Sequence, residues 1–104
     1  MIIYNVTITL DDSIQEEWLR WIQQTRIPAV LATGKFSSAK IVRVIIEEER
    51  GGTTYAVQFT TDSKATLEKY YQEDAPRFRQ ESYQLFGEKM LAFRTVLEVV
   101  SEHE

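Results

Sequence analysis

The chain contains no cysteine, and its one histidine, His103, stands next to the last residue. Without cysteine there is no disulfide, no thiolate metal site and no cysteine nucleophile. A single histidine excludes a histidine-based metal cluster and argues against a Ser-His-Asp triad. We therefore expect neither a metal nor a bound cofactor, and any catalysis would have to rely on Tyr, Trp, Asn, Arg and carboxylate side chains.

Basic charge is also scarce, with 12 Lys and Arg residues against 16 Asp and Glu and a net charge of −4. A protein that binds nucleic acid through phosphates needs a basic face, so this balance argues against a nucleic-acid partner. No apolar stretch approaches the roughly 18 to 20 residues of a membrane span. The first residues also lack the basic region of a signal peptide. We expect a cytoplasmic protein that does not contact a membrane.

The residues that are present suit a folded globular protein, because 43% of them are hydrophobic and 27% are charged. A chain of 104 residues is long enough for one domain with a core of its own. No internal repeat, linker or low-complexity segment divides it. We expect a single domain over residues 1–104.

Alternation of apolar and polar residues predicts strands, because neighbouring side chains on a strand point to opposite faces. The predicted strands cover residues 2–10, 36–49, 53–61 and 89–100. The pair Gly51-Gly52 predicts a hairpin between the second and third of these strands.

Apolar residues at helical spacing predict helices between these strands. Ser13 followed by Glu16 fits a capping box, which predicts that the Ser13 side chain caps the first helix. Pro28 opens a second, short helix over about residues 28–33. The buried stripe of the first helix consists of Ile14, Trp18, Trp21, Ile22 and Thr25. Asp62 and Ser63 cap the start of a long helix, which ends at Gly87 and is kinked or broken near Pro76.

The order of the elements is therefore β-α-β-β-α-β, which defines a ferredoxin-like α+β fold. Right-handed crossovers place the two main helices on one face of a four-stranded antiparallel sheet. The opposite face of the sheet is left without a helical layer.

Apolar residues occur on both faces of this predicted sheet. We assign to the face under the helices Ile2, Tyr4, Val6, Ile8, Tyr55, Val57, Phe59, Leu91, Phe93 and Leu97. The open face then holds Val96, Val100 and part of the run 41–46, which is a large apolar area for a monomer to expose. We expect a second copy of the chain to cover it, giving a homodimer of the dimeric α+β barrel kind.

Polar side chains are interspersed on the same predicted open face. The candidate ligand-binding residues there are Asn5, Arg43, Gln58 and Arg94. The planar guanidinium groups of Arg43 and Arg94 suit a carboxylate or phosphate, so a small anionic ligand could lie between the two sheets. The competing interpretation is that these arginines form structural ion pairs with residues such as Glu98. The spacing does not separate the two interpretations.

Other motifs in the sequence give weaker indications of function. An RNA-recognition domain shares the predicted topology, but residues 54–59 lack the basic residue and the second outward aromatic of its third strand. The pair Gly51-Gly52 is not followed by the Lys-Ser or Lys-Thr of a phosphate-binding loop. Asp74, at the predicted helix break, is interpreted as a cap for the helix that resumes after it.

Several segments spread over nearly the whole chain are distinctive in combination. They are Met1–Thr7, Glu17–Trp21, Ile27–Gly34, Thr54–Phe59, Ala75–Arg77, Phe86–Gly87 and Ala92–Thr95. Together they resemble a family of short bacterial proteins, domain-of-unknown-function family 4286. The resemblance implies a ferredoxin-like, dimeric α+β domain, and it brings no known activity, cofactor or catalytic residue. Members often carry histidine where this chain has Asp74, so no role that needs an imidazole is expected there.

Three functions remain open at this point. The first is a homodimeric module that binds a small, anionic ligand or a protein partner at the open face. The second, by analogy of fold alone, is a cofactor-independent oxygenase or isomerase. The third is a purely structural dimer without a ligand pocket.

Overall fold

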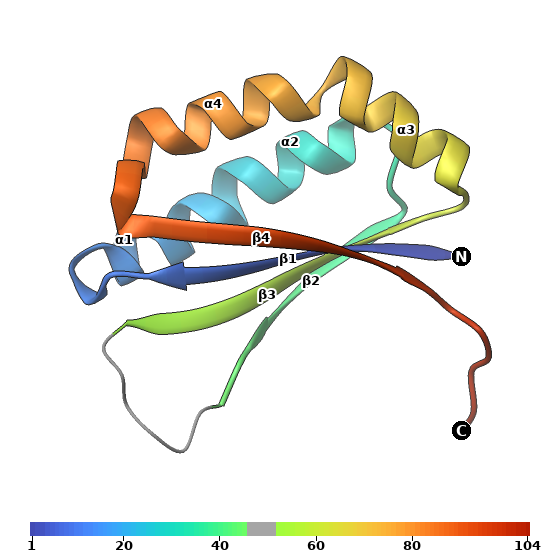
Figure 1. The fold of residues 1–104 in the computed structure, drawn as a ribbon, viewed down its shortest axis with the longest axis horizontal. Helices are drawn as coiled ribbons and strands as arrows, with labels where there is room; N and C mark the ends of the chain where they lie inside the picture. The colour runs from blue at the N-terminus through green and yellow to red at the C-terminus, as the bar shows by residue number, and fades with distance from the viewer. Residues whose placement is uncertain (46–51) are drawn as a thin grey trace.

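The structure is a computed structural model that describes residues 1–45 and 52–104. Its four strands form one antiparallel sheet in the order β2-β3-β1-β4. The strands are β1 (Ile2–Leu10), β2 (Ser38–Arg43), β3 (Thr53–Thr61) and β4 (Met90–Glu98). The helices of the described residues lie on one side of this sheet, and the other side is bare (Figure 1). The predicted ferredoxin-like α+β fold is confirmed.

Strands β1 and β3 have the bounds that their alternation predicts, whereas β2 is shorter than the predicted strand over residues 36–49. Residues 46–49 of that strand and Gly51 of the predicted turn lie outside the described residues. Gly52 adopts a φ of +87°, and a Cβ placed there would lie 2.6 Å from the backbone oxygen of Leu10. Glycine is therefore required at this position both for its backbone conformation and for the close approach of β1.

The first helical region runs without a break through α1 (Gln15–Trp21), a π-helical turn (Ile22–Arg26) and α2 (Ile27–Ala32). The carboxylate of Asp11 caps the short 3-10 turn that precedes α1 by accepting a hydrogen bond from the backbone N–H of Ser13. The predicted cap by the Ser13 side chain is therefore wrong. The predicted short helix opened by Pro28 is confirmed as α2, with Pro28 in its first turn, but it continues the first helix through the π-helical turn without a break. The wider turn accommodates a proline that lacks an N–H and crowds the preceding turn.

The π-helical turn changes which side chains of this helix face the sheet. One extra residue in the turn rotates everything after it, so the stripe that begins with Trp18 and Ile22 continues to Arg26. Thr25, which α-helical spacing places on this stripe, is exposed. Arg26 therefore takes the position on the buried stripe that the sequence predicts for Thr25.

The second helical region consists of α3 (Lys64–Glu73) and α4 (Ala75–Phe86), which meet at Asp74. Ser63 caps α3 by accepting a hydrogen bond from the N–H of Thr66, as predicted. The break before Pro76 is confirmed, and so is the end of α4 at Gly87, whose φ is +56°. Neither these helices nor any other among residues 1–45 and 52–104 is long and apolar enough to cross a membrane.

The register of β4 reverses the face that the sequence predicts for its side chains. Arg94 lies opposite Val6, and Phe93 lies opposite Thr7. Because partners in register share a face, Arg94 points to the helix side and Phe93 to the bare side. The same parity puts Leu91 and Leu97 on the bare side, and Val96 and Glu98 on the helix side. Both sets of alternate residues in β4 contain apolar side chains, so alternation alone does not determine which set faces the helices.

Candidate functional site

A cavity lies between the helices and the sheet, with an empty volume of about 530 Å³ including its opening. Its apolar walls come from all layers of the fold. They include Val6, Ile8, Ile22, Val30, Val57, Phe59 and Met90. Most of this volume is too narrow for a water molecule, so an organic ligand requires adjustment of flexible side chains such as Met90.

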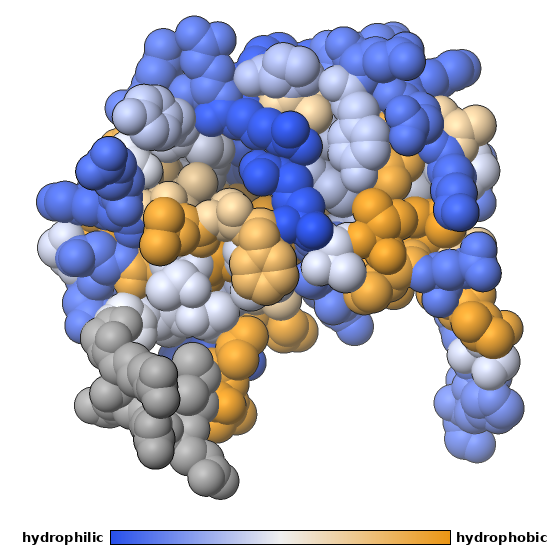
Figure 2. Space-filling model, in the orientation of Figure 1, coloured by the Kyte–Doolittle hydropathy of each residue, from blue (hydrophilic) through white to orange (hydrophobic). Residues whose placement is uncertain are grey.

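Only two of the residues that line this cavity are exposed, Arg79 from α4 and Arg94 from β4. The mouth of the cavity therefore lies beside these two guanidinium groups. Figure 2 shows a strongly hydrophilic band on this side of the molecule, which reaches from the helices down to the sheet between hydrophobic patches. Trp18, Val30 and Val57, each at most 1% exposed, are the most deeply buried of the lining residues.

Arg26 is held in the cavity wall by hydrogen bonds, by two aromatic rings and by an ion pair. Its Nη1 donates to the hydroxyl of Ser82 at 2.9 Å, and its Nη2 donates to the backbone oxygen of Phe78 at 2.8 Å. Its guanidinium also lies over the rings of Trp21 and Phe78, at 4.5 and 4.8 Å from their centroids. Glu81 approaches Nη2 at 3.4 Å. Burial lowers the pKa of the guanidinium, and Glu81 offsets part of that effect.

The arginines at the mouth have fewer partners. Arg79 donates to the phenol oxygen of Tyr4 at 3.5 Å. Neither Arg79 nor Arg94 forms an ion pair among the residues that the structure describes. No described Asp or Glu lines the cavity. The only carboxylate near its three arginines among the described ion pairs is that of Glu81, which lies outside the wall and pairs with Arg26. An anion in the mouth would supply the missing charge.

The walls also contain hydrogen-bond donors without acceptors. The indole Nε1 of Trp18 and the Nε of Arg26 are both buried and have no partner among the described residues. Buried polar atoms almost always have a partner, so two such donors in the wall of one cavity point to a ligand that accepts hydrogen bonds.

The phenol of Tyr70 also lines the cavity. Burial raises the pKa of Tyr70 to about 12, although the nearby charges of Arg26, Arg79 and Arg94 lower it. The phenol therefore keeps its proton at neutral pH and cannot act there as a base.

The structure separates the four candidate residues that the sequence grouped together. Asn5 and Gln58 lie opposite each other on the bare face, as predicted. The predicted face is wrong for Arg43, which lies opposite Tyr55 on the helix side, and for Arg94. Of the four, only Arg94 lines the cavity. The side-chain oxygen Oδ1 of Asn5 is buried without a donor among the described residues.

The cavity residues Arg26 and Arg79 were missing from the sequence-based candidates. Arg26 was missed because α-helical spacing does not anticipate a π turn, although Pro28 two residues later was a signal of irregular geometry. For Arg79 no local signal exists, since nothing in the surrounding pattern of α4 distinguishes it from a solvated arginine. The described residues also include no cluster of three or more His, Asp or Glu side chains that could hold a metal.

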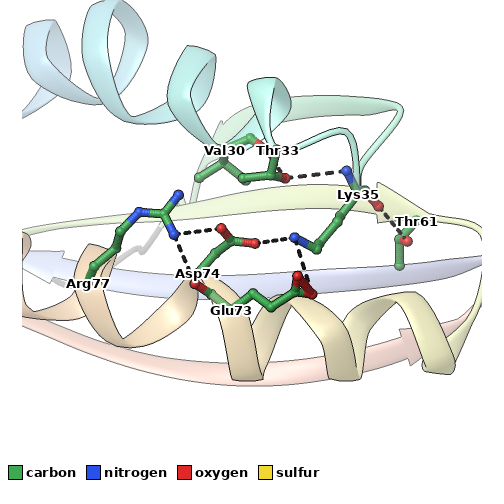
Figure 3. A network of polar contacts seen from close by, with 7 residues as sticks. All are labelled: Val30, Thr33, Lys35, Thr61, Glu73, Asp74 and Arg77. Carbon is green, nitrogen blue, oxygen red and sulfur yellow. Dashed lines mark hydrogen bonds and ion pairs between the residues drawn. The ribbon is translucent and has the colours of Figure 1, made fainter.

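A polar network fixes the helices that wall the cavity (Figure 3). The buried carboxylate of Asp74 accepts hydrogen bonds from Lys35 Nζ and from Arg77 Nη1, both at 2.6 Å. The backbone oxygen of Lys35 accepts from the hydroxyl of Thr61 at 2.7 Å. The network thus ties the turn after α2 to the end of β3 and to the junction of α3 with α4. The predicted capping role of Asp74 is wrong, because its side chain forms no cap hydrogen bond.

Fold and site together define a class: a ferredoxin-like α+β protein with an arginine-rimmed cavity between its sheet and its helices. Within this class, the chain belongs to the family described as Domain of unknown function (DUF4286), whose model matches residues 1–100. No curated protein matches the chain.

Solved structures with the same fold differ widely in sequence. A dimeric ferredoxin-like protein from an uncultured marine organism superimposes with a TM-score of 0.74 at 15% identity, over 98% of this chain and 97% of that one. HapK from Hahella chejuensis gives a TM-score of 0.72 at 8% identity, over 100% and 97% of the two chains. A candidate antibiotic biosynthesis monooxygenase from Bacillus cereus gives 0.65 at 13% identity, over 99% and 96%. These likenesses establish the fold.

Proposed function

We propose that the protein is a homodimeric binding module for a small organic anion, which it holds in the cavity between sheet and helices. The observation that carries the proposal is the arginine-rimmed mouth of an otherwise apolar cavity. Arg79 and Arg94 supply planar donors for a carboxylate, and the apolar walls suit the rest of a small organic molecule. The proposal moves the ligand from the open face, where the sequence suggested it, to the other side of the sheet.

The bare face of the sheet is assigned to a second copy of the chain. Its exposed apolar residues include Leu91 and Phe93, which are 68% and 63% exposed. Lys40 is the only charged strand residue on this face among the described ones, so two copies can meet without charge repulsion. The unpartnered Oδ1 of Asn5 would also find a donor across such an interface. A neighbour of the same fold is dimeric by its name.

A cofactor-independent enzyme is the second candidate, since buried donors such as Trp18 Nε1 suit an oxyanion that develops during a reaction. The Bacillus cereus neighbour named as a monooxygenase candidate shares the fold. Such an enzyme also needs a base that accepts a proton from its substrate. The described cavity residues include no carboxylate and no histidine, and Tyr70 has a pKa of about 12. Binding is therefore the better-supported function.

Replacing Arg94 by Gln should weaken the binding of benzoate, a minimal flat organic anion, by about 10- to 100-fold. This range corresponds to the roughly 1.5–3 kcal/mol of a hydrogen bond to a charged group. Isothermal titration calorimetry measures the change. Arg94 is exposed and has no ion pair among the described residues, so the fold should be unaffected.

Arg43→Gln is the matched control, because Arg43 also lies on a strand and on the helix side but does not line the cavity. It should leave benzoate affinity within about twofold of the wild type. Absence of benzoate binding to the wild type at millimolar concentration, or equal losses in the two variants, would contradict the proposed function.

A further inference from the structure

We infer that the ligand carries, besides its anionic group, a second oxygen acceptor at its opposite end, which receives a hydrogen bond from the indole of Trp18. The inference rests on the proposed function and specifies the class of ligand: a carboxylate with a flat apolar body and a carbonyl oxygen, or a similar acceptor, distant from the carboxylate.

The first step is the position of Trp18. Its side chain is 0% exposed and lines the cavity, whereas Arg79 and Arg94, which line it too, are exposed. Its ring stacks on Tyr55, with the centroids 5.4 Å apart and the planes inclined by 26°. Tyr55 is held in turn by a hydrogen bond of 2.9 Å from the side-chain amide of Gln15 to its phenol oxygen. The indole is therefore fixed in place by its neighbours.

The second step is the hydrogen-bonding state of the indole. A buried tryptophan normally places its N–H on an acceptor, yet Nε1 of Trp18 has none among the described residues. The side chains that line the cavity include few hydrogen-bond acceptors, because they are apolar side chains, arginines, phenols and Ser82. The phenol oxygen of Tyr4 and the hydroxyl of Ser82 already accept from Arg79 and Arg26.

The third step compares donors with acceptors over the whole cavity. Donors are in excess both at the exposed arginines, Arg79 and Arg94, and at the fully buried Trp18. Arg26 adds an unpartnered Nε in the wall. A ligand with acceptors at both ends and an apolar middle matches this distribution, whereas a simple fatty acid leaves the inner donor unsatisfied.

Two probes of equal shape test the inference. 4-Acetylbenzoate and 4-isopropenylbenzoate differ only in that a carbonyl oxygen of the first is a methylene group in the second. Wild-type protein should bind 4-acetylbenzoate about tenfold more tightly, as measured by calorimetry. Trp18→Phe keeps an aromatic ring against Tyr55 but removes the N–H, so the variant should bind the two probes equally.

The outcomes separate the inference from the proposed function. If wild-type protein binds both probes with the same affinity and Arg94→Gln weakens both, the anion site stands and the inner acceptor is overturned. A tenfold preference that persists in Trp18→Phe also overturns the inference. If neither probe binds, the proposed function fails together with the inference. Equal affinities of the wild-type protein for the two probes overturn the inference even if Trp18→Phe does not fold.

Discussion

Phe93→Glu should convert the proposed dimer into a monomer, raising its dissociation constant by at least about 100-fold. The side chain lies on the bare face of β4, the edge strand beside β1, opposite Thr7, and is 63% exposed in the single chain. In a face-to-face dimer the new carboxylates would be buried without partners, at a cost of several kcal/mol. Sedimentation velocity over a concentration series measures the change.

Leu85→Glu is the control for this experiment. Leu85 is an exposed apolar residue on α4, 52% exposed, and so lies on the helical side of the molecule. A charge there should leave the dimer intact. Both variants should remain folded, because neither side chain belongs to the buried core. A wild-type monomer at micromolar concentration, or an unchanged dissociation constant in Phe93→Glu, would contradict the assigned interface.

Asp74→Asn should lower the free energy of unfolding at pH 7 by about 2 to 4 kcal/mol, the range for breaking a buried charge pair. The substitution preserves size but leaves Lys35, whose side chain is 16% exposed, without its main counter-charge. Urea denaturation measures the loss. Glu73→Gln is the matched control, because Glu73 approaches the same ammonium at 3.8 Å but is 58% exposed. Its cost should stay below about 1 kcal/mol, as for surface pairs. Equal costs in the two variants would contradict the role assigned to the buried carboxylate.

The same variant should change the acid sensitivity of the protein. Burial raises the pKa of Asp74, but the hydrogen bonds and charges of Lys35 and Arg77 outweigh it and hold the pKa below its ordinary value of 3.8. A carboxyl with a lowered pKa stabilises the fold above its ordinary value and loses that contribution as the pH falls through the lowered one. The difference in stability between wild type and Asp74→Asn should therefore be constant from pH 5 to 7 and shrink below about pH 4.

Local patterns of apolar and polar residues were sufficient to predict most of the fold. Strands β1 and β3 alternate between clearly apolar and clearly polar sides, so both their bounds and their faces could be predicted. In β4 both sides are apolar, because one faces the cavity and the other is the bare surface around Phe93. For this reason the sequence assigns the alternate residues of β4 to the wrong faces of the sheet, and Arg94 with them.

The site itself depends on features that local patterns do not carry. Arg26 reaches the cavity only because a π turn rotates the helix after Ile22. The Lys35–Asp74 pair joins residues 39 positions apart, so a local interpretation of Asp74 as a helix cap could not find it. Trp18 was expected on a buried stripe, and this is correct, but its unsatisfied N–H becomes visible only when the surrounding side chains are in place.

The central claim is that the ligand site lies on the helix side of the sheet and not on the bare face. It is tested most directly by titrating 4-acetylbenzoate into ¹⁵N-labelled protein and following the side-chain N–H signals by NMR. The account predicts that the indole signals of Trp18 and Trp21, which line the cavity, shift with added ligand. The side-chain amide signals of Asn5 and Gln58, which lie on the bare face, should stay in place. Shifts of the two amides with unmoved indole signals would contradict the account and return the site to the bare face.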